Sequence, residues 1–242
     1  MIRLDKYLAD MGFGTRQEVK KYIRQGRVCV NQKIVKTPDV KVQEEKDSVT
    51  LDGNEVAYAS LEYYMLNKPA GVVSATEDSR DTTVLDLIRD KKRKDLFPVG
   101  RLDKDTEGLL LITNDGALAH RLLSPKKHVD KVYYAKVQGK VTEEDVRCFQ
   151  EGVNIGTDGK EEWTRPGTLE IIRSSSESEI RLSICEGKYH QVKRMFQAVG
   201  KEVTYLKRES MGPLVLDENL HSGEYRLLTK EEIKDVTEWN AE

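Results

Sequence analysis

The chain has 242 residues, with 40 Lys or Arg, 42 Asp or Glu and a formal net charge of −2 at pH 7. At roughly 100–200 residues per domain, this length predicts one large domain or two unequal ones. No apolar run approaches the roughly 18 residues of a membrane-spanning helix, which excludes that class of protein. The first residues carry no apolar signal core, so we expect a cytoplasmic location.

Cysteine and histidine are too sparse to build a metal centre. The three cysteines, Cys29, Cys148 and Cys185, are far apart and odd in number, and the four histidines are scattered. Such spacing forms neither a disulfide framework nor a cysteine-rich zinc site. We therefore expect reduced thiols and no bound metal.

The near-zero net charge conceals a basic first section. Residues 1–41 carry ten basic and four acidic side chains, whereas residues 42–60 carry one basic and five acidic ones. A local basic patch binds polyanions even on a slightly acidic protein. The pattern predicts a small basic module and an acidic connector, although a charge run alone is equally typical of a solvated helix face.

The basic section predicts two helices and two strands. One apolar stripe predicts a helix over 3–11, formed by Leu4, Tyr7, Leu8 and Met11. A Thr–Glu capping box then starts a second helix over 16–24. The segments 27–31 and 49–51 have the apolar, β-branched character of strands.

Basic side chains recur along the second predicted helix. Arg16, Lys20 and Arg24 are spaced four residues apart, which places them on one face. A row of cations can contact successive phosphates of a nucleic-acid backbone. We expect this face, with the flanking Arg3 and Arg27, to bind RNA.

The order of these elements resembles the S4 RNA-binding module. The matching residues are 3–8, the helix start at 15–16 and 26–31, and the resemblance covers about the first 55 residues. It implies binding of structured RNA through the second helix and the loop after it. The expected sections are therefore an S4 module over 1–55, a linker over 56–60 and a second domain over 61–242.

The second section is rich in strands. Candidate strands cover 63–67, 109–113, 132–139, 167–173, 179–185, 202–207 and 224–228. Helices are expected at 83–88, at 142–151, from about 191 to 199, and from 229 near the end of the chain. Runs of strands with short breaks predict an α+β fold around an antiparallel sheet, not a βαβ repeat.

The most informative segment is 100–116. Its second half is an apolar run closed by an Asn-Asp-Gly turn, which predicts a buried strand. Its first half places Arg101, Asp103 and Asp105 in the loop before that strand, a common location for catalytic groups. A polar turn with salt-bridged aspartates is the alternative interpretation.

As a pattern, Gly-Arg-Leu-Asp-x-Asp-Thr-x-Gly-Leu-Leu-Leu resembles the signature of the pseudouridine synthases. The resemblance implies that Asp103 is the essential aspartate. Gly100 before Arg101 is similar to the RsuA branch, which acts on ribosomal RNA and typically carries an S4 module. The family fold implied is a mixed, largely antiparallel sheet with a central catalytic cleft.

Two further segments match the family. Residues 131–137 match its Lys-x-Tyr motif, which implies that Tyr133 is the active-site tyrosine unless it is an ordinary strand aromatic. In the segment 186–196, Lys193 matches the basic residue that pairs with the catalytic aspartate, and the adjacent Arg194 is the rival assignment.

The resemblance also implies a mechanism without cofactor or metal, because the isomerisation needs no redox step and no group donor. The target uridine must be flipped out of the RNA helix. Asp103 would then attack ribose C1′ or assist loss of the C2′ proton. We expect the splayed backbone to be held by Arg101, Lys188, His190 and Arg194.

The segment Tyr-His-Gln-Val-Lys-Arg-Met is similar in sequence to the corresponding segment of the small-subunit enzymes of the family. It implies action on 16S rRNA, at position 516, in a partly assembled small subunit. We expect a monomer, because nothing in the sequence suggests a self-complementary apolar surface. The alternatives are a large-subunit 23S rRNA enzyme and a non-catalytic RNA-binding assembly factor. A glycoside hydrolase using Asp103 and Asp105 is a further alternative, which the presence of only two Trp residues disfavours.

Overall fold

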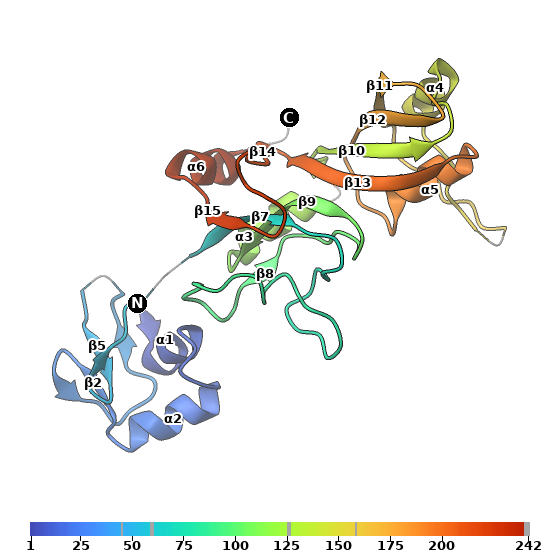
Figure 1. Ribbon diagram of the computed structural model, residues 1–242. Coiled ribbons are helices and arrows are strands. Elements are labelled where there is room, and N and C mark those ends of the chain that lie inside the picture. Colours follow the sequence, from blue (N-terminus) through green and yellow to red (C-terminus); the bar gives the residue numbers. More distant parts are fainter. Residues whose placement is uncertain (45, 59–60, 125–126, 158, 240–242) are drawn as a thin grey trace. The chain divides into compact units, whose positions relative to one another are not determined.

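A computed structural model describes residues 1–44, 46–58, 61–124, 127–157 and 159–239. The chain divides into two compact units, which Figure 1 colours from blue to red along the sequence. The first unit comprises Met1–Glu62 and Ile88–Leu96, and the second comprises Tyr63–Leu87 and Phe97–Glu242.

The first unit has the two predicted helices, α1 (Leu4–Asp10) and α2 (Arg16–Arg24). Thr15 accepts the Glu18 N–H and Glu18 accepts the Thr15 N–H, so the predicted capping box starts α2. The described strands form a sheet in the order β3 (Lys33–Ile34), β2 (Val28–Val30), β5 (Val49–Leu51) and β6 (Asn54–Glu55), and a pair of β1 (Ile2–Arg3) and β4 (Lys41–Val42). Apolar side chains from both helices and from the strands share one buried core.

The first compact unit includes residues outside the predicted section 1–55. Val56, which we placed in a linker, is 3% exposed, and its carbonyl accepts the Tyr7 hydroxyl at 2.6 Å. The segment Ile88–Leu96, which we assigned to the second domain, belongs to the first unit. Within that segment Arg93 is buried, and its guanidinium lies 3.5 Å from the Asp10 carboxylate and over the Tyr58 ring. Residues 59–60 of the expected linker lie outside the described residues.

The second unit is built on a mixed sheet, which confirms the predicted α+β class. Its described strands run in the order β11 (Thr168–Arg173), β12 (Glu177–Ile184), β10 (Lys131–Gln138), β13 (Glu202–Met211), β9 (Glu107–Thr113), β7 (Tyr63–Lys68) and β15 (Tyr225–Leu227). The short strands β8 (Phe97–Pro98) and β14 (Leu214–Val215) pair with β9 and β13. All pairs are antiparallel except β9 with β13.

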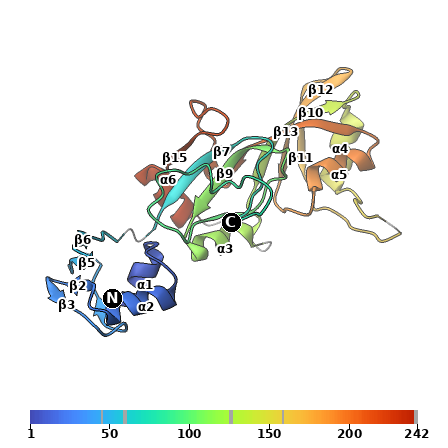
Figure 2. The ribbon, with the colours of Figure 1, turned by 60° about the horizontal axis from the view of Figure 1, so that its bottom comes forward.

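Four described helices pack on this sheet: α3 (Gly116–Leu123), α4 (Glu143–Glu151), α5 (Gln191–Ala198) and α6 (Lys230–Glu238). Figure 2 shows α4 and α5 beside strands β10–β13, where the Phe149 and Phe196 rings lie 4.9 Å apart. α3 and α6 share a second apolar cluster over β7 and β9. The helix predicted over 83–88 does not form. Its Thr83–Asp86 hydrogen bonds close a single turn, and the chain leaves the second unit at Ile88.

The parallel pair β9 and β13 approaches most closely at Gly108. This residue has φ +101°, and a Cβ atom there would lie 2.2 Å from the Arg208 carbonyl oxygen. Arg208 is in turn the strand partner of Tyr133 on β10. The glycine therefore sets the spacing between the strand that follows Asp103 and the strands that carry Tyr133 and Arg208.

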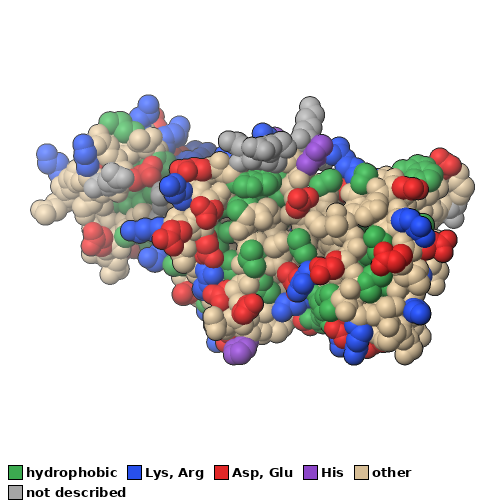
Figure 3. Space-filling model, turned by 90° about the horizontal axis from the view of Figure 1, so that it is seen from above, with side chains coloured by type: hydrophobic (Ala, Val, Ile, Leu, Met, Phe, Trp, Pro, Cys, Tyr) green, Lys and Arg blue, Asp and Glu red, His purple; other side chains and the backbone are tan. Residues whose placement is uncertain are grey.

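Figure 3 shows acidic and basic side chains interspersed over one face of the molecule. None of the described helices combines the length and the apolar composition that crossing a membrane requires.

Candidate active site

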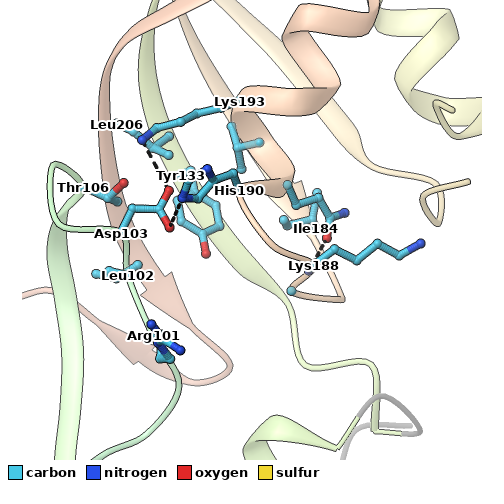
Figure 4. Close-up of a pocket in the computed structure, with 13 residues that line it drawn as sticks. Arg101, Leu102, Asp103, Thr106, Tyr133, Ile184, Lys188, His190, Lys193 and Leu206 are labelled. Atoms are coloured by element: carbon cyan, nitrogen blue, oxygen red, sulfur yellow. Dashed lines mark hydrogen bonds and ion pairs between the residues drawn. The ribbon is translucent and has the colours of Figure 1, made fainter. Parts of the chain in front are cut away.

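A small pocket of about 80 Å³ lies at the middle of the sheet of the second unit. Asp103 enters it from the loop before β9, Tyr133 from β10, and Lys193 from the first turn of α5. Figure 4 shows Asp103 and Lys193 pointing toward each other, with His190 beside them and Tyr133 behind. The structure thus brings together the three residues that we predicted as catalytic.

Two nitrogen atoms face the Asp103 carboxylate. The Lys193 ammonium lies 3.3 Å from Asp103 Oδ2, and His190 Nε2 lies 3.5 Å from Asp103 Oδ1. The Asp103 side chain is 27% exposed, so its ion pairs are partly shielded from solvent. This arrangement places one ammonium and one imidazole beside an accessible carboxylate.

Asp105 binds the same lysine more closely than Asp103 does. Its two carboxylate oxygens lie 2.6 and 2.8 Å from the Lys193 ammonium. Burial opposes the charged form of Lys193, but the hydrogen bond from Lys193 to Asp105 and the charges of both aspartates raise its pKa above the ordinary value. The same hydrogen bond lowers the pKa of Asp105. Lys193 is therefore a charged bridge between the two carboxylates.

Arg194, the rival partner of Asp103, points elsewhere. Its guanidinium donates to the Glu162 carboxylate and to the Ile155 carbonyl oxygen, both at 2.5 Å. A second nitrogen donates to the Tyr189 carbonyl oxygen at 3.0 Å. Because one residue along a helix turns the side chain by about 100°, Lys193 and Arg194 cannot serve the same pocket.

The loop that carries Asp103 is clamped by two residues that the sequence interpretation missed. Ser74 Oγ donates to the Leu102 carbonyl at 2.8 Å and accepts the Leu102 N–H at 3.0 Å. The Lys68 ammonium, fully buried, donates to the carbonyl oxygens of Pro69, Lys104 and Thr106. Burial lowers the pKa of Lys68 to about 8. A lysine at the end of an otherwise apolar strand was the signal that could have identified it.

Hydrogen bonds between its own residues also stabilise the turn before α5. His190 has the left-handed φ of +47°, and the buried Gln191 accepts the Lys188 N–H and donates to Glu186. The exposed Tyr189 ring stacks on the His190 imidazole, with centroids 3.8 Å apart. These contacts fix the imidazole beside Asp103.

The other predicted RNA contacts of this unit lie at the rim of the pocket. Arg101 is exposed at the edge of the pocket. Lys188 also lines it, but Figure 4 shows its side chain extending away from Asp103, and its ammonium donates to the Trp163 carbonyl at 2.5 Å. No group of three or more His, Cys, Asp or Glu side chains in the described ranges is arranged to hold a metal ion.

The predicted RNA-binding residues of the first unit divide into paired and exposed cations. Arg3 forms an ion pair with Asp5, Lys20 lies 3.8 Å from the same carboxylate, and Arg27 pairs with Asp52. Exposed on α2, away from these pairs, are Arg16 and Arg24. The predicted row therefore exists, and its two ends are its most accessible members.

Comparison with known proteins identifies both units. Residues 62–198 match the RNA pseudouridylate synthase family, and residues 2–49 match the S4 domain. The chain belongs to the RNA pseudouridine synthase family. The S4 domain is the RNA-binding part of this RNA pseudouridine synthase, and the two matches account for the S4-plus-synthase organisation predicted from the motifs.

Several relatives match over nearly the whole chain. The uncharacterized RNA pseudouridine synthase YtzG of Bacillus subtilis is 50% identical, over 98% of this chain and 99% of its own. The ribosomal small subunit pseudouridine synthase A of Vibrio vulnificus is 43% identical over 97% of this chain and 99% of its own. That of Escherichia coli K12 is 41% identical over 97% of this chain and 100% of its own. A crystal structure of a pseudouridylate synthase, 39% identical, covers 98% of this chain and 100% of its own, with a TM-score of 0.67.

Proposed function

We propose that this RNA pseudouridine synthase isomerises one uridine of 16S rRNA, in a partly assembled small subunit. The support is the full-length identity of 41–43% to proteins named ribosomal small subunit pseudouridine synthase A. The resemblance of its motifs to that group favours position 516 as the target. The 50% identical YtzG carries no substrate in its name, so the choice of RNA rests on the more distant relatives.

We assign the catalytic carboxylate to Asp103, as the nucleophile at C1′ or as the base at C2′. The observation that carries this assignment is the partly shielded carboxylate, which has a lysine ammonium 3.3 Å away on one oxygen and an imidazole 3.5 Å away on the other. The positive charge of Lys193 stabilises the anionic carboxylate that the reaction requires. An uncharged carboxylic acid at this place could not begin the reaction.

The isomerisation balances without any added group. In one route an Asp103 oxygen bonds to ribose C1′ as the C1′–N1 bond breaks, and the uracil leaves as an anion. In the other, Asp103 removes the C2′ proton as the same bond breaks, which leaves a glycal. After the base rotates, its C5 bonds to C1′. In the first route this releases Asp103 from C1′, and in the second the proton returns to C2′. C5 then loses its proton and N1 gains one. The geometry of the carboxylate suits both routes.

Tyr133 forms the wall of the pocket on which we place the uracil ring. It lines the pocket and is only 8% exposed, so little of it is in contact with bulk solvent. An aromatic ring can stack on a flipped base, and its hydroxyl can relay the C5 proton.

The substrate is tested by modification of unmodified transcripts. The full chain is incubated with 16S and 23S transcripts, naked and in partly assembled particles, and pseudouridine is mapped by carbodiimide adducts that stop reverse transcription. One modified position in 16S rRNA supports the proposal. Modification of 23S rRNA alone would show that 23S rRNA, and not 16S rRNA, is the substrate. Binding without any modification would favour the assembly-factor alternative.

A further inference from the structure

A second, larger cavity adjoins the catalytic pocket. Its volume is about 400 Å³, and it shares Arg101, Tyr133 and Lys188 with the small pocket. Tyr133 therefore lines both the space in front of Asp103 and this neighbouring cavity. The proposed reaction uses the small pocket only, which leaves the larger space without a role.

The described lining of the larger cavity is strongly basic. It includes five cationic side chains, Arg101, Lys131, Arg165, Lys188 and Arg208, and one carboxylate, Glu186. That carboxylate already accepts the backbone N–H of Arg165 and the side-chain amide of Gln191. Lys188 lies 3.7 Å from the Glu162 carboxylate, so the excess of positive charge rests on the other four cations of the lining.

Two of these cations are buried side by side on β10 and β13. Lys131 is 8% exposed and Arg208 is 2% exposed. Arg208 Nη2 is buried and has no hydrogen-bond partner among the described residues, while the Lys131 ammonium donates to the Val129 carbonyl oxygen. Burial, with the charge of Arg208 added to it, lowers the pKa of Lys131 to about 8.

A buried pair of like charges is unfavourable unless an anion compensates it. Guanidinium and ammonium groups together favour a tetrahedral oxyanion, which offers several acceptors to several donors. We propose that this cavity binds a backbone phosphate that flanks the flipped uridine. The proposal rests on the proposed function, because it requires the uracil of the flipped uridine to lie against Tyr133 in the small catalytic pocket.

The shared wall of the two pockets selects the phosphate. A nucleotide whose base lies before Asp103 carries its own 3′ and 5′ phosphates one sugar away, and the adjoining cavity begins at the residues that both pockets share, Tyr133 among them. The buried cations Lys131 and Arg208 would hold the phosphate, and the exposed Arg165 would close over it from the rim. The cavity would thereby fix the ribose while the uracil rotates.

The test compares two probes that differ only in phosphate. The full chain is titrated calorimetrically with uridine 3′,5′-bisphosphate and with uridine. The expected result is that the bisphosphate binds at least about tenfold more tightly, since a charge-assisted hydrogen bond contributes about that factor. Lys131→Met should remove most of this preference and Arg165→Gln part of it, while the affinity for uridine stays unchanged.

Arg147→Gln is the matched control, because Arg147 is an exposed cation on α4 outside both pockets. It should keep the full preference for the bisphosphate. Arg165→Gln changes an exposed side chain, so it keeps the test decisive if Lys131→Met fails to fold. A wild-type chain without a phosphate preference, or a preference that survives in the folded variants, would overturn the inference. Because the titration measures binding and not isomerisation, a chain that prefers the bisphosphate but modifies no RNA would contradict only the proposed function.

Discussion

Replacing Gly108 with alanine should damage both the fold and the site. The new Cβ would lie 2.2 Å from the Arg208 carbonyl oxygen, and backbone cannot move aside as a flexible side chain can. Overpacking of this kind costs about 1–3 kcal/mol, and a positive φ costs a non-glycine residue about 1–2 kcal/mol. Gly108→Ala should therefore lower the free energy of unfolding by about 3 kcal/mol or more.

Gly139 provides the control for backbone strain alone. Its φ of +97° is close to the +101° of Gly108, but a Cβ atom there would meet nothing nearer than the Lys201 side chain at 3.9 Å. Gly139→Ala should therefore cost only about 1 kcal/mol. Urea denaturation of the full chain measures both variants, with the wild type as reference.

The same substitution should reduce activity beyond its effect on stability. Forcing β9 from β13 moves the Asp103 loop relative to Tyr133, which lies one strand further along the sheet. A misplacement of about 1 Å costs about a hundredfold in rate, so kcat of folded Gly108→Ala should fall by about that factor. Equal destabilisation by the two alanine variants, or a fully active Gly108→Ala enzyme, would refute the reasoning.

Three further predictions concern the loop clamp and the S4 unit. Ser74→Ala removes both hydrogen bonds to Leu102, so kcat should fall about tenfold in a tritium-release assay while urea denaturation shows a loss of about 1–2 kcal/mol. Burial holds the pKa of Lys68 at about 8 in the folded chain, against roughly 10.4 when unfolded. The folded state therefore binds fewer protons between these two pH values, and its unfolding free energy should rise with pH there by about 3 kcal/mol. Lys68→Met should remove this rise, as urea denaturation at several pH values would show. Removing the charges of Arg16 and Arg24 together should weaken RNA binding and reduce the slope of log affinity against log salt by about 1–2, with catalysis on saturating RNA unchanged.

Local signals in the sequence predicted much of the fold. The capping boxes that begin α2, α4 and α6 involve residues three apart, so each helix start was readable from a short segment. The apolar run of β9 and the alternation of β10 were equally local, and both strands occur where predicted. These elements depend on their own residues more than on distant ones.

Features that depend on distant contacts were not predictable. Residues 83–88 carry a helix-like pattern, but the chain enters the first unit at Ile88 because Arg93 and Leu96 are buried there. The short strands β8 and β14 exist only through pairing with long neighbours. The helix α3 was also missed, although Asp115 caps its start by accepting the Leu118 N–H.

The site shows the same division. The motif located Asp103, Tyr133 and Lys193, and the structure places them around one pocket. The tighter contact of Lys193 with Asp105 could not be inferred, because the two aspartates are equivalent in a one-dimensional pattern. The buried charge of Arg208 likewise becomes visible only when three strands are assembled side by side.

The most direct test of the central claim is tritium release from 16S rRNA labelled at uridine C5, incubated in partly assembled particles. Wild type and Asp103→Asn are compared, and RNA binding by both is measured separately. The account predicts release by the wild type, no release by Asp103→Asn, and equal RNA affinity for the two proteins. Full release by Asp103→Asn would contradict the assignment of Asp103 as the catalytic carboxylate.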